Sequence, residues 1–411
     1  MRQLYSIGIY IASLLIKVLA LFNTKLKQGV VGRTETFKKL KNNLKPNDKT
    51  FWFHCASLGE YEQGLPVFET LKKKHPHYKI VLSFFSPSGY EIRKNTPIAD
   101  VVVYIPFDTK KNAKRFLDIV NPDYVIFVKY EIWPNFLFEI KRRNLKAILI
   151  SAVFRKQQSF FKWQGGFMRS ALFAFQHIFT QNENSKKLLE TIGYTNVSVS
   201  GDTRFDRVSN QLLVDNTVSF IEDFKNGKLC VVMGSTWPED DKLFLDYINT
   251  NASNDFKFII APHNVKPSYT ASLKTQINAK TITFSEMENS NLSDYNVFIL
   301  DTIGYLSKVY SYADIAYVGG GAGKTGLHNI LEPAVFGIPI IIGKNYGNFP
   351  EAVSMVESEG IKPVTSSSEF NMAMDNLVNN PEFRKNKGEA CSHFINENKG
   401  AVIQILNYIR I

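Results

Sequence analysis

Cysteine is scarce in this sequence, and the spacing of the few cysteines offers no pattern for pairing. The 411 residues include three cysteines, Cys55, Cys230 and Cys391, and none belongs to a C-x-x-C pair. An odd number at such distances argues against a disulfide scaffold or a zinc ribbon, and it fits a reducing compartment. A content of 44% hydrophobic and 21% charged residues excludes a disordered chain, a collagen-like fibre and a polytopic membrane protein.

Acidic residues are scarce in the first 50 positions, so the net charge is unevenly distributed. This segment contains ten of the 49 lysines and arginines but only two of the 38 aspartates and glutamates, and it therefore carries eight of the eleven net positive charges. The rest of the chain is close to balanced. A basic surface for nucleic acid spread over the folded body is not expected, and nucleic acid is not predicted as a partner.

Long hydrophobic runs are equally rare, and the one that exists lies within this basic segment. Residues 4–22 form a 19-residue apolar stretch whose only charge is Lys17. The stretch is long enough to span a membrane, although a lysine near its end weakens that interpretation, and residues 23–27 lack the small-residue site of a cleaved signal peptide. We predict a membrane anchor over residues 1–25, spanning or lying in the interface, with a buried core helix as the alternative.

The lysines that follow the apolar stretch also predict an orientation. Basic residues beside an anchor favour anionic headgroups and the cytoplasmic side of a membrane. We therefore expect anionic lipids of an inner membrane as partners, with the body of the protein at its cytoplasmic face.

From residue 51 onward, short apolar runs alternate with amphipathic stretches, which predicts an α/β fold of parallel sheets covered by helices. Expected strands are 51–55, 80–85, 101–104, 124–128, 147–150 and 177–180 in a first half, and 229–234, 256–261, 297–300, 315–318 and 338–342 in a second. Clear helical patterns cover 61–74, 110–119 and 132–143.

This alternation divides the body of the chain into two doubly wound domains. We expect a first domain over 26–205, a linker over 206–228 and a second domain over 229–411, with a last helix able to pack back on the first domain. Ligands bind beyond the carboxyl ends of strands in such sheets, so two halves of this kind predict a cleft between them.

Ser57 and Glu60 lie in the turn from the first strand into the first helix. A glutamate at the carboxyl end of a strand is well placed to act as a general base. The spacing Ser57-x-x-Glu60 is also that of a capping box, in which the glutamate only completes a helix start. Local sequence alone favours the cap.

A glycine-rich segment follows the strand at 315–318. Five of the eight residues 319–326 are glycine, which is typical of a loop whose backbone N–H groups hold a phosphate. Gly323-Lys324-Thr325 resembles part of a P-loop, but that motif needs glycine where Val318 stands, so ATP binding of this type is rejected. The spacing Asn329-x-x-Glu332 is again typical of a cap.

Two further pairs follow predicted strands of the second half and are candidates for ligand contact, namely Ser235-Thr236 and Pro262-His263. His75 and His77 lack carboxylate or cysteine neighbours in the sequence, so no metal site is predicted. No Ser-His-Asp or Cys-His arrangement is evident, and no bound cofactor is expected.

Taken together, the motifs resemble those of the 3-deoxy-D-manno-octulosonic acid (Kdo) transferases, in order and spacing over nearly the whole chain. The resemblance rests on the apolar amino terminus, Ser57-Leu58-Gly59-Glu60, Tyr130-Glu131-Ile132-Trp133-Pro134, Gly201-Asp202-Thr203-Arg204-Phe205-Asp206, the glycine-rich loop, His328-Asn329-Ile330-Leu331-Glu332-Pro333 and Asn348-Phe349-Pro350-Glu351. It implies a GT-B glycosyltransferase with two Rossmann-like domains and an amino-terminal membrane-anchoring helix. The implied reaction is the inverting, metal-independent transfer of Kdo from the co-substrate CMP-Kdo to a lipid A precursor, lipid IVA, in lipopolysaccharide biosynthesis.

Carried onto this sequence, the resemblance makes Glu60 the general base, which reverses the local preference for a cap. It implies further substrate contacts at Ser57, Gly59, Glu131 and Arg204. The implied donor-binding residues are Ser235, Thr236, Pro262, His263, Gly320, Gly321, Gly323, Gly326, Asn329, Glu332, Asn348 and Glu351.

Some positions depart from the family pattern. His263 stands where the family commonly has arginine, Arg204 where it usually has lysine, Leu327 where it usually has glycine, and Tyr305 where it usually has glutamate. Two alternatives remain open at this stage. One is a GT-B transferase that uses a UDP-sugar, such as a lipid A disaccharide synthase, and the other is a membrane-bound P-loop nucleotide-binding protein.

Overall fold

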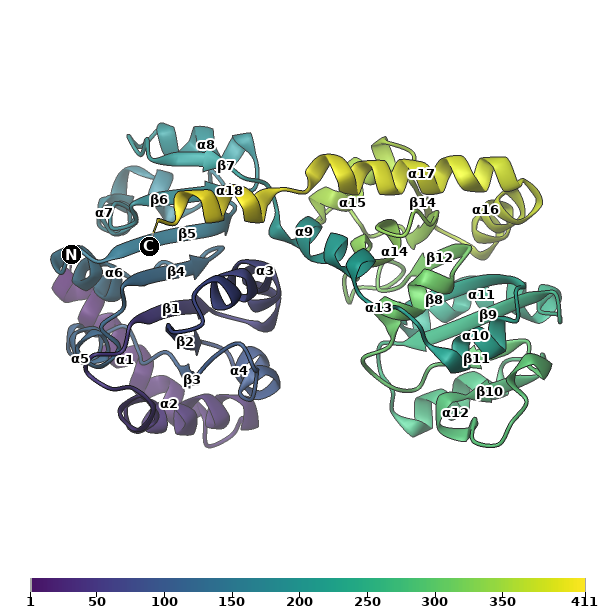
Figure 1. Cartoon of the computed structure of the whole chain (residues 1–411), viewed down its shortest axis with the longest axis horizontal. Coiled ribbons are helices and arrows are strands. Elements are labelled where there is room, and N and C mark those ends of the chain that lie inside the picture. Colours follow the sequence, from purple (N-terminus) through teal and green to yellow (C-terminus); the bar gives the residue numbers. More distant parts are fainter. Residues whose placement is uncertain (1, 411) are drawn as a thin grey trace. The chain divides into compact units, whose positions relative to one another are not determined.

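The computed structural model describes residues 2–410, which divide into two compact units (Figure 1). The first unit extends to Arg207 and takes up the chain again at Lys399, and the second comprises Val208–Asn398. Each unit contains one sheet of seven strands, and all strand pairs are parallel. The predicted α/β class is thus confirmed.

The first sheet has the order β3-β2-β1-β4-β5-β6-β7. Its strands are β1 (Thr50–Cys55), β2 (Lys79–Phe84), β3 (Val101–Tyr104), β4 (Tyr124–Val128), β5 (Lys146–Ala152), β6 (His177–Thr180) and β7 (Val197–Val199). The helices of this unit are α1 (Arg2–Leu19), α2 (Thr24–Asn43), α3 (Leu58–Lys74), α4 (Pro87–Arg93), α5 (Lys110–Val120), α6 (Pro134–Arg142), α7 (Gly166–Leu172), α8 (Glu183–Glu190) and α18 (Ala401–Tyr408), and α9 (Thr203–Asn210) crosses into the second unit.

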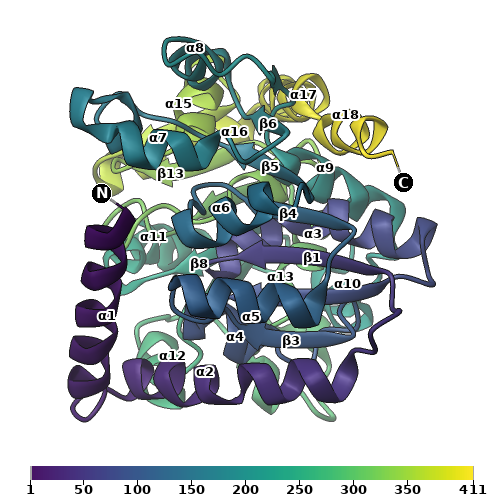
Figure 2. The same cartoon turned by 90° about the vertical axis from the view of Figure 1, so that its left-hand side faces the viewer.

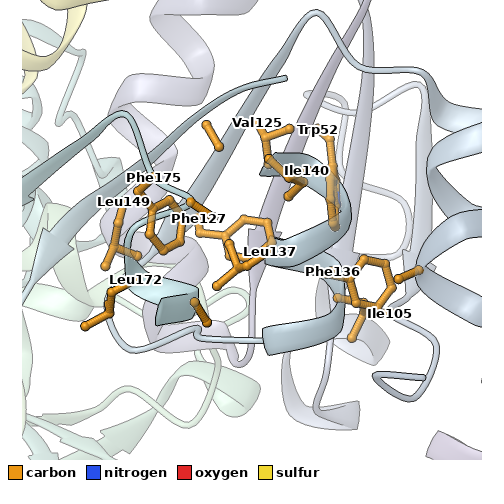
Figure 3. Packing of buried hydrophobic residues seen from close by; sticks show 14 of the residues in the cluster. Trp52, Ile105, Val125, Phe127, Phe136, Leu137, Ile140, Leu149, Leu172 and Phe175 are labelled. Carbon is orange, nitrogen blue, oxygen red and sulfur yellow. The ribbon is translucent and has the colours of Figure 1, made fainter. Parts of the chain in front are cut away.

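Both faces of this sheet are buried, which explains why its strands read as continuous apolar runs. Successive side chains of β1 alternate between two cores. Trp52 belongs to a core cluster that includes residues of α5, α6 and α7, part of which is drawn in Figure 3, whereas Phe51 and Phe53 belong to a cluster with residues of α3 and α18 on the opposite face. His54 shares the face of Trp52.

The second sheet has the order β10-β11-β9-β8-β12-β13-β14. Its strands are β8 (Leu229–Thr236), β9 (Phe256–Pro262), β10 (Thr281–Thr283), β11 (Val297–Ile299), β12 (Ile315–Val318), β13 (Ile340–Gly343) and β14 (Ile361–Val364). The helices are α10 (Ser219–Lys225), α11 (Pro238–Asn251), α12 (Pro267–Thr275), α13 (Leu306–Val309), α14 (Leu331–Ala334), α15 (Pro350–Glu357), α16 (Ser367–Asn379) and α17 (Pro381–Asn398).

In each sheet the strand order reverses between two neighbours. The chain moves outward from β1 through β2 to β3 and then returns to the other side of β1 with β4. The same reversal lies between β8 and β12 in the second sheet. Such switch points leave the carboxyl ends of two adjacent strands open to a ligand, so they define where the site is to be sought.

α1 is the one helix within residues 2–410 that is long and apolar enough to cross a membrane, judged by length and composition. None of its residues is buried, and Leu4, Ile7, Ile11 and Leu14 are among its exposed apolar side chains. The helix runs along one edge of the first unit and meets α2 at a corner (Figure 2). The Tyr5 hydroxyl donates to Oδ2 of Asp108 at 2.8 Å and thereby ties α1 to the domain.

The carboxyl-terminal helix α18 packs on the first unit. Gly400, with φ of 111°, separates α17 from α18 in a left-handed conformation that glycine adopts without strain. Asp206 accepts the N–H groups of Gly400 at 3.0 Å and Val402 at 3.4 Å, so its carboxylate caps α18. Val402 and Ile405 then join the core on the α3 face of the sheet.

The sequence pattern missed three strands, β7, β10 and β14. All three are edge strands of three or four residues, and polar side chains interrupt each of them. An edge strand is paired on one side only and needs less apolar surface, so it leaves a weak signal in hydrophobic periodicity.

Replacing Asp206 with alanine should loosen α18 while leaving the rest of the unit folded. The loss of this cap is expected to lower the free energy of unfolding by about 1 kcal/mol. The unfolding midpoint should fall, and the amide hydrogens of Gly400 and Val402 should exchange faster. Asp223→Ala, an exposed aspartate on α10, is the matched control and should change neither quantity. Unaltered exchange at Gly400 in the Asp206 variant would contradict the cap.

Candidate active site

The turn from β1 into α3 contains the glutamate arm of the predicted capping box. Oε2 of Glu60 accepts the backbone N–H groups of Ala56 and Ser57, the latter at 3.3 Å. Within residues 2–410, Oε1 accepts no hydrogen bond. The cap is therefore confirmed, and it engages only one of the two carboxylate oxygens.

Glu60 is 9% exposed, and its surroundings alter its acidity. Burial, and after it the charge of the Glu131 carboxylate, raise the pKa of Glu60 to about 7, against the lowering effect of the Ala56 N–H and of Lys129. The adjacent Gly59 is exposed, and a Cβ atom there would meet no other atom within 4 Å. Glu60 thus combines an oxygen that accepts no hydrogen bond within residues 2–410, a pKa near neutrality and an exposed neighbour, Gly59.

Glu131 lies in the loop that follows β4, the neighbour of β1 across the switch point. Its Oε2 accepts the indole N–H of Trp133 at 2.7 Å and lies 3.1 Å from Nε2 of the buried His54. The structure brings Ser57, Gly59, Glu60 and Glu131 to the carboxyl ends of two adjacent strands.

Arg204 lies at the start of α9, where its guanidinium pairs with Asp202. Nε donates to Oδ2 of Asp202 at 2.8 Å, and Oδ1 of the same carboxylate accepts the Arg204 backbone N–H at 2.9 Å. The side chain is 30% exposed, so it is partly open to an anionic ligand while Asp202 orients it.

The glycine-rich loop of the second unit is organised by Asp240, a completely buried residue in the first turn of α11. Oδ2 of Asp240 accepts the N–H groups of Trp237 at 2.9 Å and Gly320 at 2.8 Å. Oδ1 accepts the hydroxyl of Tyr317 at 2.7 Å and the N–H of Ala322 at 3.3 Å. Four donors thus compensate the burial of this carboxylate and join α11 to β12 and its loop.

Close backbone approaches explain the glycines of this loop. Gly320 has φ of 88°, and a Cβ atom there would lie 2.1 Å from the carbonyl oxygen of Gly326. Asn345 holds the loop from the β13 side, because its N–H donates to the Gly321 carbonyl at 2.9 Å and its amide to the Gly323 carbonyl at 2.7 Å.

These contacts determine which N–H groups of the loop can reach a ligand. The N–H groups of Gly320 and Ala322 are occupied by Asp240. In the part of the chain that the structure describes, those of residues 323–326 donate to no protein acceptor. An anion held by this loop would therefore be bound by its second half.

The residues Ser235-Thr236 and Pro262-His263 lie at the paired ends of β8 and β9. Thr236 pairs with Pro262 in the sheet, and the Thr236 carbonyl accepts the His263 N–H at 3.0 Å. The sheet register shifts between Gly234 and Thr236, where Ser235 has φ of 55°, and Thr236 itself is 1% exposed.

Three rings cover this end of the sheet. The His263 ring stacks on Trp237 with centroids 4.7 Å apart and on His328 at 4.4 Å. The Trp237 indole N–H donates to Nε2 of His328 at 2.9 Å. Burial, and after it the proximity of His263, lower the pKa of His328 to about 4, and burial also lowers the pKa of His263, so both imidazoles are neutral at pH 7.

The remaining predicted donor residues lie after the glycine-rich loop. The Asn329 amide donates to Oε1 of Glu332 at 3.0 Å, and its Oδ1 accepts the Leu331 N–H at 3.2 Å. Asn348 is exposed in the turn before α15, and Glu351 lies in the first turn of that helix.

Sequence reasoning missed four residues that organise these loops, namely His54, Trp237, Asp240 and Asn345. Asp240 had a detectable signal, since Trp237-Pro238-Glu239-Asp240 follows a strand and begins a helix with acidic residues. The role of Asn345 depends on two loops separated by more than 20 residues, and no local pattern indicates it.

Known proteins are similar to this chain over most of its length. A family model described as 3-Deoxy-D-manno-octulosonic-acid transferase (kdotransferase) matches residues 31–207. The 3-deoxy-D-manno-octulosonic acid transferase of Haemophilus influenzae is 28% identical over 376 residues, 89% of this chain and 87% of that one. The protein of the same description from Aquifex aeolicus is 25% identical over 330 residues, 78% of this chain and 83% of that one.

Solved structures with little sequence similarity share the fold. The UDP-GlcNAc 2-epimerase from Neisseria meningitidis bound to UDP-GlcNAc has a TM-score of 0.61 at 17% identity, over 87% of this chain and 98% of that one. MurG of Acinetobacter baumannii has a TM-score of 0.52 at 10% identity, over 88% of this chain and 99% of that one.

Two parallel seven-stranded sheets, each with one switch point, together with these structural neighbours define a fold of the GT-B class. Within that class, the chain belongs to the 3-deoxy-D-manno-octulosonic acid transferase family. The family and the fold that the sequence motifs implied are thus confirmed.

Replacing Asp240 with asparagine should loosen the start of the glycine-rich loop. An amide offers one acceptor oxygen to four donors and turns its own NH₂ group toward the others, at an expected cost of about 3 kcal/mol in the free energy of unfolding. Amide hydrogen exchange of Gly320 and Ala322 should accelerate. Asp246→Asn, an exposed position on the same helix, should leave both measurements unchanged. Equal protection of Gly320 in the Asp240 variant and the wild type would refute the assignment.

Proposed function

We propose that this protein transfers Kdo from CMP-Kdo to a lipid A precursor, lipid IVA, in lipopolysaccharide biosynthesis, with inversion at the anomeric carbon. The observation that carries the proposal is the state of Glu60 in a chain of this family. One of its oxygens caps α3, the other accepts no hydrogen bond within residues 2–410, and its pKa is about 7. Such a carboxylate matches what a general base requires at neutral pH.

The chemistry needs a single proton acceptor. Oε1 of Glu60 takes the proton of the acceptor hydroxyl while the hydroxyl oxygen forms a bond to the anomeric carbon of Kdo. The bond from that carbon to the phosphate oxygen breaks, and CMP leaves with the electron pair. Displacement from the face opposite the leaving group inverts the centre, and the reaction needs one base only.

The second unit supplies groups suited to the nucleotide. The free N–H groups of residues 323–326 would donate to the CMP phosphate. Glu332, held by Asn329, would accept hydrogen bonds from the ribose hydroxyls, with Asn348 and Glu351 in the same pocket. His263 is uncharged and would contribute a hydrogen bond and ring contact where the family commonly has the charge of arginine.

The first unit carries features suited to an acylated acceptor. A groove of about 660 Å³ lies between α1, α2 and the start of α4, and its lining includes Ile16, Leu26, Phe85, Ile92 and Phe107. The same groove is lined by Ser86, whose N–H donates to the Ala56 carbonyl at 2.7 Å, in the turn that holds Glu60. An acyl chain in this groove would place the sugar of the lipid near Glu60.

The apolar helix α1 and the lysines that follow it suit a membrane-bound substrate. With its apolar side chains exposed, α1 would enter or line an inner membrane, and the basic residues up to position 50 would contact anionic headgroups at the cytoplasmic face. This location would bring the enzyme to the lipid.

The assay that tests the proposal mixes purified protein with CMP-Kdo and tetra-acylated lipid A precursor in detergent and follows CMP release and the mass of the lipid. A lipid product heavier by one or more Kdo residues is expected. Absence of transfer from CMP-Kdo, together with transfer from a UDP-sugar, would replace the proposal with the UDP-sugar alternative.

Glu60→Gln should retain CMP binding and lose transfer by a factor of about 100 or more, because an amide cannot accept the proton. For the wild type, the rate should fall as the pH decreases through about 7, since only the ionised Glu60 can act as base. Calorimetry with CMP and initial rates between pH 5 and 9 provide the two measurements. Near-wild-type turnover of the variant would leave Glu60 with its capping role alone.

Ile92→Asp should weaken the use of the acylated acceptor. Ile92 is 59% exposed in the groove, so a charge there should not impair folding but should raise the KM for the lipid about tenfold by opposing apolar contact. Ile403→Asp changes a residue that is 64% exposed on α18 and serves as control. The groove would lose its assigned role if the two variants had the same KM as the wild type.

A further inference from the structure

The loop between β5 and α7 exposes a tryptophan. This segment, residues 153–165, is called the Trp163 loop below. Trp163 is 93% exposed, the largest fraction among the large apolar side chains within residues 2–410. An indole ring has a large apolar surface, so its full contact with water is unfavourable unless a partner covers it.

The exposure of Trp163 does not come from a loose loop. Phe154 and Phe160 are buried in a core cluster of the first unit, with their ring centroids 6.0 Å apart. A Cβ atom at Gly165 would lie 1.7 Å from the carbonyl oxygen of Ser159, so the backbone is closely folded on itself and only glycine fits there. The loop therefore has a defined backbone that presents Trp163 outward.

The charge around Trp163 is of one sign. Residues 140–182 contain eight lysines and arginines and no aspartate or glutamate. Arg155, Lys156 and Lys162 are exposed in the loop, and Nη2 of Arg169 donates to the Lys162 carbonyl at 3.0 Å. None of these four forms an ion pair within residues 2–410. The loop thus carries positive charge that the described chain does not neutralise.

The Trp163 loop lies at the edge of the sheet that carries the candidate site. β5 is parallel to β4, so the loop leaves the sheet at the same carboxyl edge as the turn that contains Glu60. The helix that follows the loop, α7, contacts the amino end of α1, since the rings of Phe167 and Tyr5 lie 5.3 Å apart (Figure 2). The loop is therefore continuous with the apolar helix through α7.

We propose that the Trp163 loop is a second membrane-contact surface of this protein. The Trp163 indole enters the interface of an anionic bilayer, where its ring contacts acyl chains and its N–H stays near water. Arg155, Lys156 and Lys162 contact the phosphate groups of the lipids. The inference rests on the proposed function in taking a membrane as the location of the protein, and it does not depend on the transfer chemistry.

A second copy of the chain is a poorer occupant of this surface than a bilayer. Two copies that met through their Trp163 loops would bring like charges together, which opposes association. An anionic bilayer supplies both the apolar region and the negative charge that the loop lacks. With α1 and the loop in contact with the same bilayer, the first unit could not rotate about α1, and the carboxyl edge of its sheet would stay turned toward the lipid.

Quenching of tryptophan fluorescence tests the position of the indole. The full-length protein is bound to vesicles of phosphatidylethanolamine and phosphatidylglycerol whose acyl chains carry bromine close to the headgroup. Trp163→Phe removes the one fully exposed indole and leaves Trp52, Trp133 and Trp237, which are buried or half-buried. The wild type should be quenched and shifted to shorter wavelength on binding, and the variant should lose most of this change.

Affinity for vesicles supplies the second measurement. Trp163→Ala should lower partitioning about tenfold, and Lys156→Ala and Lys162→Ala about fivefold each. In neutral phosphatidylcholine vesicles the lysine variants should match the wild type, whereas the tryptophan variant should remain weaker. Ile303→Ala, at a residue that is 81% exposed, and Lys187→Ala, at an exposed lysine on α8, are the matched controls and should change nothing.

Two results would overturn the inference. One is an unquenched Trp163 in wild-type protein that is bound to vesicles, and this result decides the question even where α1 binds too tightly for affinities to be compared. The other is a dimer in solution, seen by light scattering, that Trp163→Ala dissociates while vesicle binding is unchanged. Kdo transfer in detergent without quenching would refute this inference alone, and quenching without transfer would refute the proposed reaction alone.

Discussion

The reversal of strand order at one point in each sheet is the constraint on which the site depends. The loops that leave β1 and β4, and those that leave β8 and β12, turn away from one another to opposite faces of their sheets. Room is left above the sheet edge for carboxylates in the first unit and for backbone N–H groups in the second. All strands are parallel and their side chains are packed in buried cores, so these loops start from the ends of rigid sheets.

In both units an acidic side chain accepts backbone N–H groups at the first strand-to-helix turn, but the number of donors differs. Glu60 and Asp240 both occupy the third position of the helix that follows the first strand of their sheet, and both bind N–H groups of the preceding turn. Asp240 is shared by four donors on both oxygens, so it serves as a structural anchor. Glu60 uses one oxygen, and this difference in donor number is what leaves a capping residue able to take up a proton.

The sequence was sufficient for the fold class, for most central strands and for the motifs that lead to the family. It could not decide between cap and base at Glu60, because both depend on the same spacing and differ only in how many donors reach the second oxygen. It missed His54 and Asn345, since their partners lie on other strands and loops and become neighbours only in the folded sheet. The edge strands were missed because they bury little apolar surface and so need no strong hydrophobic periodicity.

The position of Trp133, whose indole N–H donates to Glu131, depends on how α6 begins. Oδ2 of Asp108 accepts the N–H of Asn135 at 3.0 Å and Oδ1 accepts that of Phe136 at 2.9 Å, so this buried carboxylate holds the first turn of α6 directly after Trp133. The hydroxyl of Tyr5 on α1 donates to the same Oδ2 at 2.8 Å. The exposed apolar helix and the start of α6 thus share this carboxylate as a hydrogen-bond partner. Asn135 adds a second link, because Nε of Arg2 donates to its Oδ1 and its amide donates to Oγ of Ser6, both at 3.4 Å. A displacement of α1 would therefore reach the loop that carries Glu131 through Asp108 and Asn135 together.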